Sequence, residues 1–375
     1  MLYYEKGGAE MSIRTCMLTA CAVLLCFMIG CGDDTDSGGG EGKDNTPACP
    51  FTEAQMDAAA LYSEECGGSA VLIMYKGGII FEEYQNGADE NTAQHIHSAT
   101  KGFWAGALAA AIEDGLISDM DETVAGTITE WLDGDLHFGK IEITVGHLAS
   151  LSSGLSQDVE YIQGLDPLAP DIYQYVVDEL DMVRRAGVWF QYGPSHYYAF
   201  GEFLSRKLDA AGMDPDPLAY LEERILDRIG VEYSYWERDD AGNPHIPNGC
   251  FITPRNWIKY GRFILQNGQW EGVSIVDEEC MKALRNIDGP NPGHARFLWA
   301  NTNGGYGHTP DQITPEGAEG GFIYHDGHTG MVAALGAGKN RMYIIPQLDT
   351  VVLRQTSIER DTFIDHDFLA KLLTP

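Results

Sequence analysis

Residues 98–115 read SATKGFWAGALAAAIEDG, and this segment is the most informative part of the chain. From Gly102 to Ile112 it carries no charged side chain, its apolar residues recur at helical spacing, and Gly115 is a natural C-terminal stop. The segment therefore predicts a helix buried on most of its surface, with Ser98 and Lys101 one turn apart at its start. Backbone N–H groups at such a start favour developing negative charge, and the lysine is near enough to hold or take the serine proton. This arrangement is typical of a nucleophilic serine hydrolase.

The four-residue motif S-x-x-K also has an ordinary explanation. About one such motif is expected by chance in a chain of this length. Ser98 as a helix N-cap and Lys101 reaching out to solvent would explain the same letters. Segments elsewhere in the chain therefore have to distinguish the two interpretations.

The composition is ordinary for a soluble globular protein, apart from a strong acidic bias. The chain has 375 residues, with 56 acidic and 24 basic side chains and a formal net charge of −32. Such a charge argues against nucleic acid and anionic surfaces as partners, and it says little about the substrate. We therefore expect no nucleic-acid partner.

Residues 1–30 are typical of an export signal. Met11 is the expected start, Arg14 supplies the positive charge, and the apolar run from Cys16 to Gly30 is too short to span a bilayer as a mature helix. The run ends Met28-Ile29-Gly30-Cys31, which resembles a bacterial lipoprotein cleavage box. Ordinary secretory cleavage beside an incidental cysteine is the alternative.

The cleavage box implies that Cys31 becomes the lipidated first residue. Residues 31–50 are polar and glycine-rich, as expected of a flexible tether, and residues 51–375 are expected to form the globular domain. The sequence therefore predicts an exported lipoprotein, anchored at a bacterial membrane surface and facing the periplasm or the outside.

Four cysteines remain beyond the lipidation site: Cys49, Cys66, Cys250 and Cys280. In an exported protein four cysteines allow three pairings, and the sequence does not choose among them. Closure between neighbours in sequence, Cys49–Cys66 and Cys250–Cys280, is the preferred pairing here. Unpaired buried thiols are the alternative.

Apolar runs near both ends of the domain predict paired strands. Residues 71–81 and 342–353 each read as two strands joined by a tight turn, and a closing helix is expected from about Thr362. One antiparallel sheet built from both chain ends would bring these runs together, with a mostly helical insertion over residues 117–320. The predicted fold class is therefore α+β, a sheet flanked by helices.

Three further segments, together with the tetrad Ser98–Lys101, carry a resemblance to a known superfamily. Asp114–Asp121 follows the apolar helix, Ile143–Leu155 reads ITVGHLASLSSGL, and Thr253–Trp270 reads TPRNWIKYGRFILQNGQW. They resemble the serine β-lactamase and penicillin-binding-protein superfamily, in its class C, esterase and nylon-oligomer-hydrolase-like branch. The resemblance covers residues 68–373 and implies a β-lactamase/transpeptidase-like fold.

The resemblance implies that Ser98 is the nucleophile and that Lys101 and Tyr192 form a general base pair. Tyr192 lies in the segment Phe190–Gly201, which is similar to the family's tyrosine motif, with Gly193-Pro194 in place of Ser-Asn. In lactam-acting relatives the asparagine helps to grip the substrate amide. Its replacement therefore disfavours β-lactam binding.

A third catalytic element has two candidate positions. His328-Thr329-Gly330 matches the family's H-T-G by letter, whereas Gly336–Asn340 matches by its distance from the end of the following strand. We favour the second position, which implies that the backbone N–H groups of Ser98 and Ala337 form the oxyanion hole. Gly336 and His328 are then candidate substrate-binding residues.

The implied activity is cleavage of a small ester, amide or peptide through an acyl-Ser98 intermediate, without metal or cofactor. Two alternatives share the fold: a non-catalytic ligand- or peptidoglycan-binding protein, and a true β-lactamase or D-Ala-D-Ala carboxypeptidase. A metallohydrolase using His95, His97, His325 and His328 is a third, although these pairs lack a clear carboxylate framework. No serine lies in a G-x-S-x-G elbow, which argues against a conventional α/β-hydrolase.

Overall fold

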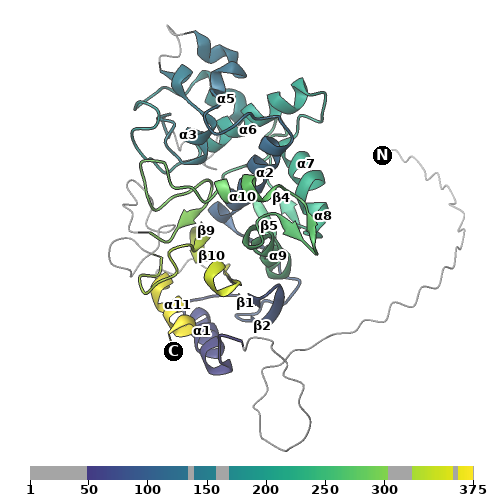
Figure 1. Ribbon diagram of the computed structural model, residues 1–375, viewed down its shortest axis with the longest axis vertical. Helices are drawn as coiled ribbons and strands as arrows, with labels where there is room; N and C mark the ends of the chain where they lie inside the picture. Colours follow the sequence, from purple (N-terminus) through teal and green to yellow (C-terminus); the bar gives the residue numbers. More distant parts are fainter. Residues whose placement is uncertain (1–48, 134–138, 158–168, 303–322, 358–361, 375) are drawn as a thin grey trace, which may run out of the picture. The chain divides into compact units, whose positions relative to one another are not determined.

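The computed structural model (Figure 1) describes residues 49–133, 139–157, 169–302, 323–357 and 362–374. The predicted signal segment, the lipidation site Cys31 and nearly all of the predicted tether lie outside these residues. Within the described ranges, no helix is both long enough and apolar enough to cross a membrane.

One antiparallel sheet joins the two ends of the domain, which confirms the predicted α+β class. Its strands, in spatial order, are β2 (Gly78–Tyr84), β1 (Ala70–Tyr75), β11 (Thr350–Gln355), β10 (Asn340–Ile345), β9 (Val332–Gly336) and β8 (Trp299–Ala300). Strands from the start and the end of the chain, β1 and β11, are therefore direct neighbours and pair antiparallel. The two predicted hairpins are β1–β2 and β10–β11.

The first hairpin turns on two residues with positive φ. Lys76 (φ 49°) and Gly77 (φ 81°) connect β1 to β2. Two consecutive left-handed residues form the turn whose twist matches that of paired strands, and glycine adopts this conformation without steric cost. On its other edge β1 pairs with β11, with Ala70 opposite Gln355. The local turn and the long-range pairing together define the register of β1.

Helices cover both faces of this sheet. The first helix, α1 (Glu53–Glu65), packs against the last, α11 (Asp365–Leu373), and Figure 1 shows the two side by side. Another helix, α9 (Pro254–Leu265), packs on β1, β10 and β11. The closing helix begins at Asp365 and not at about Thr362, a small shift at a helix start.

Alternating side chains of β10 reach the two helical layers. Met342 lies against Gly261 of α9, whereas its neighbours Arg341 and Tyr343 bond to Asp365 at the start of α11. This alternation is the ordinary period of a strand, in which successive side chains point to opposite faces. Because both faces are covered, every residue of β10 is buried.

The predicted apolar helix is α2 (Lys101–Glu113), and it is buried from Lys101 to Ala111. Its aromatic residues Phe103 and Trp104 meet the ring of Trp236 at centroid distances of 5.6 and 5.8 Å. A short 3₁₀ turn, His97–Thr100, leads directly into it. The tetrad therefore spans the junction of the two, with Ser98 on the 3₁₀ turn and Lys101 as the first α-helical residue.

The expected helical insertion, residues 117–320, holds most of the remaining helices. In its described parts they are α3 (Val145–Ala149), α5 (Ile172–Asp178), α6 (Ser195–Ala210), α7 (Pro217–Leu221), α8 (Asp227–Ile229) and α10 (Glu278–Ala283). Two small sheets accompany them, one of β3 (Gln94–His95), β5 (Cys250–Ile252) and β4 (Tyr235–Trp236), the other of β6 (Gln269–Trp270) and β7 (Val273–Ser274). Two elements of the same stretch, α9 and β8, belong to the layers of the main sheet.

The preferred cysteine pairing is wrong, because Cys49, Cys66, Cys250 and Cys280 are all free thiols. The fold gives each neighbour a different setting. The Cys66 thiol faces the carbonyl oxygen of Thr362, with 3.6 Å between Sγ and O. Cys250 is buried in β5, whereas Cys280 lies in α10. Neighbours in sequence therefore belong to separate elements, which spacing alone does not reveal.

Candidate active site

Ser98 lies on a strained turn. The residue before it, His97, has a φ of 50°, which a residue with a Cβ seldom adopts without support from its surroundings. That support comes from Ile96, whose N–H donates to the carbonyl oxygen of Cys250 at 3.1 Å and whose carbonyl accepts from the N–H of Ala99 at 3.1 Å. The turn is thereby fastened to β5, and Ser98 itself stays partly exposed.

Lys101 is a buried amine to which the described part of the chain offers no ionic partner. The residue is only 6% exposed, and its Nζ donates to the carbonyl oxygen of Pro247 at 2.6 Å. Two aromatic rings flank the amine, Tyr192 at 5.0 Å and Tyr197 at 5.6 Å from Nζ to the ring centroid. Among the residues that the structure describes, no carboxylate pairs with it. Burial therefore lowers the pKa of Lys101 to about 7.

Tyr192 brings a phenol to the same place. It precedes α6, is buried, and stacks on Trp299 of β8 at a centroid distance of 6.0 Å. Within the described residues its hydroxyl has no partner at ordinary hydrogen-bond geometry, although the Ser98 side chain is near enough to influence the pKa of the phenol. Burial raises the pKa of Tyr192 above its usual range, and the Ser98 hydroxyl and the charge of Arg341 lower it less strongly. The structure thus brings Ser98, Lys101 and Tyr192 together.

A buried histidine holds the loop that carries Tyr192. The Nε2–H of His196 donates to the carbonyl oxygen of Gln191 at 2.8 Å, and its Nδ1 accepts from the hydroxyl of Ser153 at 2.7 Å. Since a carbonyl can only accept, these two shorter contacts assign the proton to Nε2, and the amide nitrogen of Gln157, 3.0 Å from Nε2, is then a neighbour without a hydrogen bond to it. Burial lowers the pKa of His196 to about 4, so the ring is neutral near pH 7. Ser153 belongs to the predicted motif Ile143–Leu155, which explains how that motif reaches the site.

Gly336, at the end of β9, touches the Ser98 turn. A Cβ atom placed on this glycine would lie 2.1 Å from the carbonyl oxygen of Ile96 and 3.0 Å from the nitrogen of Ala99. A side chain cannot fit there, so the backbone at Gly336 and the next residue, Ala337, approaches the turn directly. The sequence analysis expects the backbone N–H groups of Ser98 and Ala337 to form an oxyanion hole. These two groups therefore belong to segments that touch, the Ser98 turn and the end of β9.

An ion pair buttresses the strand end at Gly336. Arg341 donates to the carbonyl oxygen of Gly336 at 2.8 Å and to the carboxylate of Asp365 at 2.7 and 3.3 Å. Both partners are fully buried, and Tyr343 donates to the same carboxylate at 2.7 Å. The side-chain amide of Asn340 donates to the carbonyl oxygen of Ala337 at 3.0 Å. These contacts hold the carbonyls of Gly336 and Ala337 in place.

His328, the candidate chosen by letter, lies at the opposite end of β9. It precedes the strand, whereas Gly336 ends it, and a five-residue strand is about 17 Å long at 3.3–3.4 Å per residue. The His328 ring stacks on Tyr324, 6.1 Å between centroids, and not on a residue of the Ser98 turn. The structure therefore separates His328 from the other candidate residues.

The structure also does not bring together the histidines of the alternative metallohydrolase, which are His95, His97, His325 and His328. His95 and His97 stack on each other at 4.0 Å beside the Ser98 turn. Within the described part of the chain, His325 instead groups with Asp326 and with His366 of α11. The sequence analysis missed His366 altogether, since nothing near it in the chain marks it as a partner of His325.

Sequence reasoning also missed Arg341, Asp365 and Pro247, and it gave Asn340 no role beyond its place in the segment Gly336–Asn340. One signal was available for Arg341, which stands beside the apolar run Met342–Ile345 in a strand expected to be buried. A charge in a buried strand requires a buried partner, although the sequence does not say which. Pro247 acts through its carbonyl oxygen, which every residue possesses, so no sequence signal identifies it.

Comparison with known proteins identifies the family to which the chain belongs. The model of the Beta-lactamase family matches residues 52–356. An uncharacterized protein of Alkalihalophilus pseudofirmus is 23% identical over 267 residues, which cover 63% of this chain and 71% of that protein.

Solved structures of similar fold include enzymes and binding-protein relatives. One, named as a candidate 6-aminohexanoate-dimer hydrolase of Bacillus anthracis, has a TM-score of 0.64 and 17% identity, covering 83% of this chain and 79% of its own. The hydrolase EstCE1, with promiscuous acyltransferase activity, has a TM-score of 0.61 and 13% identity, with coverages of 84% and 96%. A penicillin-binding protein homologue of Caulobacter crescentus has a TM-score of 0.61 and 15% identity, with coverages of 88% and 97%. At these identities the likeness shows a shared β-lactamase/transpeptidase-like fold.

Proposed function

The chain belongs to the beta-lactamase family and is in general terms a serine hydrolase, and from this premise we propose that it cleaves an ester or a linear amide through an acyl-Ser98 intermediate. The observation that carries the proposal is the buried amine of Lys101, which has no carboxylate partner in the described part of the chain and a pKa lowered to about 7. A lysine held in this state serves as a base near neutral pH.

In the proposed mechanism Lys101 is the base and Tyr192 relays protons. Near pH 7 a large fraction of Lys101 is neutral, whereas burial keeps the Tyr192 phenol protonated. Ser98 Oγ forms a bond to the substrate carbonyl carbon as its proton moves to Lys101 Nζ. The bond to the leaving oxygen or nitrogen then breaks, and this atom takes a proton from Tyr192, which Lys101 replaces. Water attacks the acyl-enzyme by the reverse route and releases the acid.

The oxyanion of each tetrahedral intermediate would be bound by the backbone N–H groups of Ser98 and Ala337. The close approach of Gly336 to the Ser98 turn and the bond from Arg341 to the Gly336 carbonyl support this assignment. Loss of one such donor typically lowers kcat by about 10²–10³-fold, so the rigidity of this strand end matters for the rate. Arg341 and Asn340 would then position the backbone of Ala337.

Esters and non-lactam amides are the preferred substrate class. Gly193-Pro194 stand where lactam-acting relatives carry Ser-Asn, and the strand end at Gly336–Asn340 offers no K-T-G lysine to hold a substrate carboxylate. Gln157 occupies the space beside Gly193, since a Cβ there would lie 1.9 Å from the Gln157 side-chain oxygen.

Membrane attachment through a lipid on Cys31 is part of the proposal and rests on the sequence around that residue. Growth of the producing cells with an alkyne-labelled fatty acid tests it. We expect label in the membrane fraction for the natural sequence and none for Cys31→Ser. Equal labelling of both proteins would contradict it.

Intact-mass spectrometry tests the hydrolase itself. The purified protein is incubated with a fluorophosphonate probe and, separately, with a penicillin, beside the variants Ser98→Ala and Ser274→Ala, the second removing an exposed serine. We expect one fluorophosphonate adduct that only Ser98→Ala loses, followed by hydrolysis of p-nitrophenyl esters. A penicillin adduct on Ser98 would instead support a lactam-acting enzyme. No adduct on folded protein would overturn the proposal and favour a binding protein on the same fold.

A further inference from the structure

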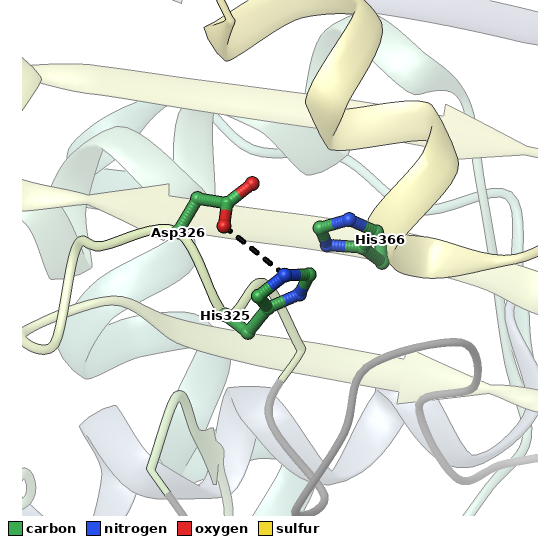
Figure 2. Close-up of side chains that lie close together, drawn as sticks. All are labelled: His325, Asp326 and His366. Atoms are coloured by element: carbon green, nitrogen blue, oxygen red, sulfur yellow. Dashed lines mark ion pairs between the residues drawn. The ribbon is translucent and has the colours of Figure 1, made fainter.

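Two segments distant in sequence, the loop before β9 and the start of α11, bring three metal-binding side chains together. His325 and Asp326 lie in the loop before β9, and His366 lies in the first turn of α11 (Figure 2). Each offers one ligand atom, and these atoms lie within 4.8 Å of one another. His325 Nε2 is 3.1 Å from a carboxylate oxygen of Asp326. The cluster is therefore already assembled before any ion is considered.

We propose that His325, Asp326 and His366 form a binding site for a divalent transition-metal ion, with Zn²⁺ as the reference ion. Two imidazoles and one carboxylate are ligands that Zn²⁺, Co²⁺, Ni²⁺ and Cu²⁺ prefer, whereas Mg²⁺ and Ca²⁺ require a shell of oxygen atoms. The fourth position of a tetrahedral ion would be filled by water.

The surroundings of His366 point to a ligand. Its Nδ1 atom is buried and has no hydrogen-bond partner within the described residues, an arrangement that an ion would relieve. The His366 ring stacks on those of His325 and Tyr324, at 4.0 and 5.3 Å between centroids. These contacts limit the rotation of the ring and hold it beside His325.

An ion can reach the cluster from solvent. Asp326 is the one carboxylate among the three described residues that form it. The side chains of His325 and Asp326 are 41% and 52% exposed, so solvent reaches two of the three ligands. Asp365, the neighbour of His366, is fully buried in an ion pair with Arg341 and is not part of the cluster. Asp326 is therefore the carboxylate that completes the site.

Binding there would join the loop before β9 to the last helix. The expected consequence is added stability, since the ion would link His325 and Asp326 of the loop before β9 to His366 of α11. The proposal does not depend on the proposed hydrolase, and it is tested by a different readout.

The test measures thermal unfolding of protein without a polyhistidine tag, freed of metal by a chelator and dialysed. We expect Zn²⁺, Ni²⁺ and Co²⁺ to raise Tm by several degrees with saturation at one ion per chain, and Mg²⁺ and Ca²⁺ to leave it nearly unchanged. Co²⁺ should also produce visible absorption bands of a site with nitrogen and oxygen ligands.

A matched pair of variants separates specific binding from neutralisation of the acidic surface. Asp326→Asn and Asp367→Asn each remove one negative charge near α11, but Asp367 is exposed and outside the cluster. We expect Asp326→Asn and His366→Ala to lose the Zn²⁺-dependent shift, and Asp367→Asn to keep it. Should His366→Ala fail to fold, His325→Gln takes its place. An equal shift in all variants, an equal effect of Mg²⁺, or no binding of any transition metal would overturn the proposal.

Discussion

Of the buried cations in the described part of the chain, Arg341 and Lys101 differ in their pairing. Arg341 is fully buried and shares two bonds with the carboxylate of Asp365, whereas Lys101 is buried beneath two aromatic rings and bonds to the carbonyl oxygen of Pro247. A carboxylate keeps its partner charged, so Arg341 is a fixed part of the scaffold. Without a carboxylate partner in the described part of the chain, Lys101 loses its proton easily. A carboxylate partner therefore distinguishes a buried cation that supports the site from one that can exchange a proton in it.

The unpaired cation also lowers the stability of the fold. The pKa of Lys101 falls from 10.5 to about 7 on folding, so between these pH values the unfolded chain binds a proton that the folded chain does not. The free energy of unfolding then rises with pH through this window, by up to about 1.4 kcal/mol per pH unit for this group. At pH 7 the protein therefore lacks stability that it would gain in alkali, a cost typical of reactive groups.

The largest expected effect comes from removing the unpaired cation. Lys101→Met should lower kcat/KM for a p-nitrophenyl ester by about 10²–10⁴-fold, because the proposed general base is lost. The free energy of unfolding of the same variant at pH 7 should be higher by roughly 1–3 kcal/mol, because an amine that is costly to bury is replaced by an apolar chain. The variant should therefore unfold at a higher denaturant concentration.

Lys140→Met is the matched control for this variant. Lys140 is also buried, donates to the carbonyl oxygen of Val177 at 2.9 Å, and has a pKa lowered to about 8 mainly by burial. It lies on the turn Lys140–Glu142, away from the Ser98 turn. Activity should be retained in Lys140→Met. If both variants lost activity equally, burial of a lysine would not distinguish the base, and the comparison would fail.

Removing the partner of the paired cation should have the second largest effect. Asp365→Asn leaves the Arg341 charge buried without its carboxylate, which typically costs about 3–5 kcal/mol of folding free energy. Urea unfolding measures the loss. Asp367→Asn, two residues along α11 and exposed, should change the free energy of unfolding little. Stability of Asp365→Asn equal to that of the control would show that Arg341 does not need its partner.

The smallest effect is the dependence of the rate on pH. Since the neutral amine of Lys101 is the active form and its pKa is about 7, kcat/KM should fall about tenfold per pH unit below 7 and level off above it. Steady-state rates on a neutral ester between about pH 5 and 9 measure this, with buffer and ionic strength held constant. A limb near pH 10, or a rate that falls as pH rises through 7, would assign the base to another group.

Much of the fold could be predicted from the sequence because its signals are local. The turn at Lys76-Gly77, the apolar run behind Lys101 and the strand pair ending at Gln355 each lie within a short window. The pairing of β1 with β11 followed from apolar strands at both ends of one domain. Ser98, Lys101 and Tyr192 could be selected by resemblance, and the structure brings them together.

The rest depends on contacts between residues far apart in the chain. Neither the partner of Arg341 nor the neighbour of His325 is marked in sequence, because Asp365 and His366 become relevant only when α11 packs on the sheet. The cysteine pairing was wrong for the same reason, since closeness in sequence does not place Cys250 and Cys280 in one element. His328 shows the converse, since a match of letters does not bring a residue to the site.

The pairing of β1 with β11 has a consequence for how the protein is made. β1 leaves the ribosome early, yet nearly the whole domain must be translated before β11 can cover its open edge. Contacts so distant in sequence form slowly, and an uncovered strand edge invites association with other chains. Gly336 and Arg341, which hold the strand end against the Ser98 turn, are synthesised late as well. In the proposed mechanism a nascent chain therefore carries Ser98 without its oxyanion hole, and Ser98 can react only after β9 and β10 have been made and have folded onto its turn.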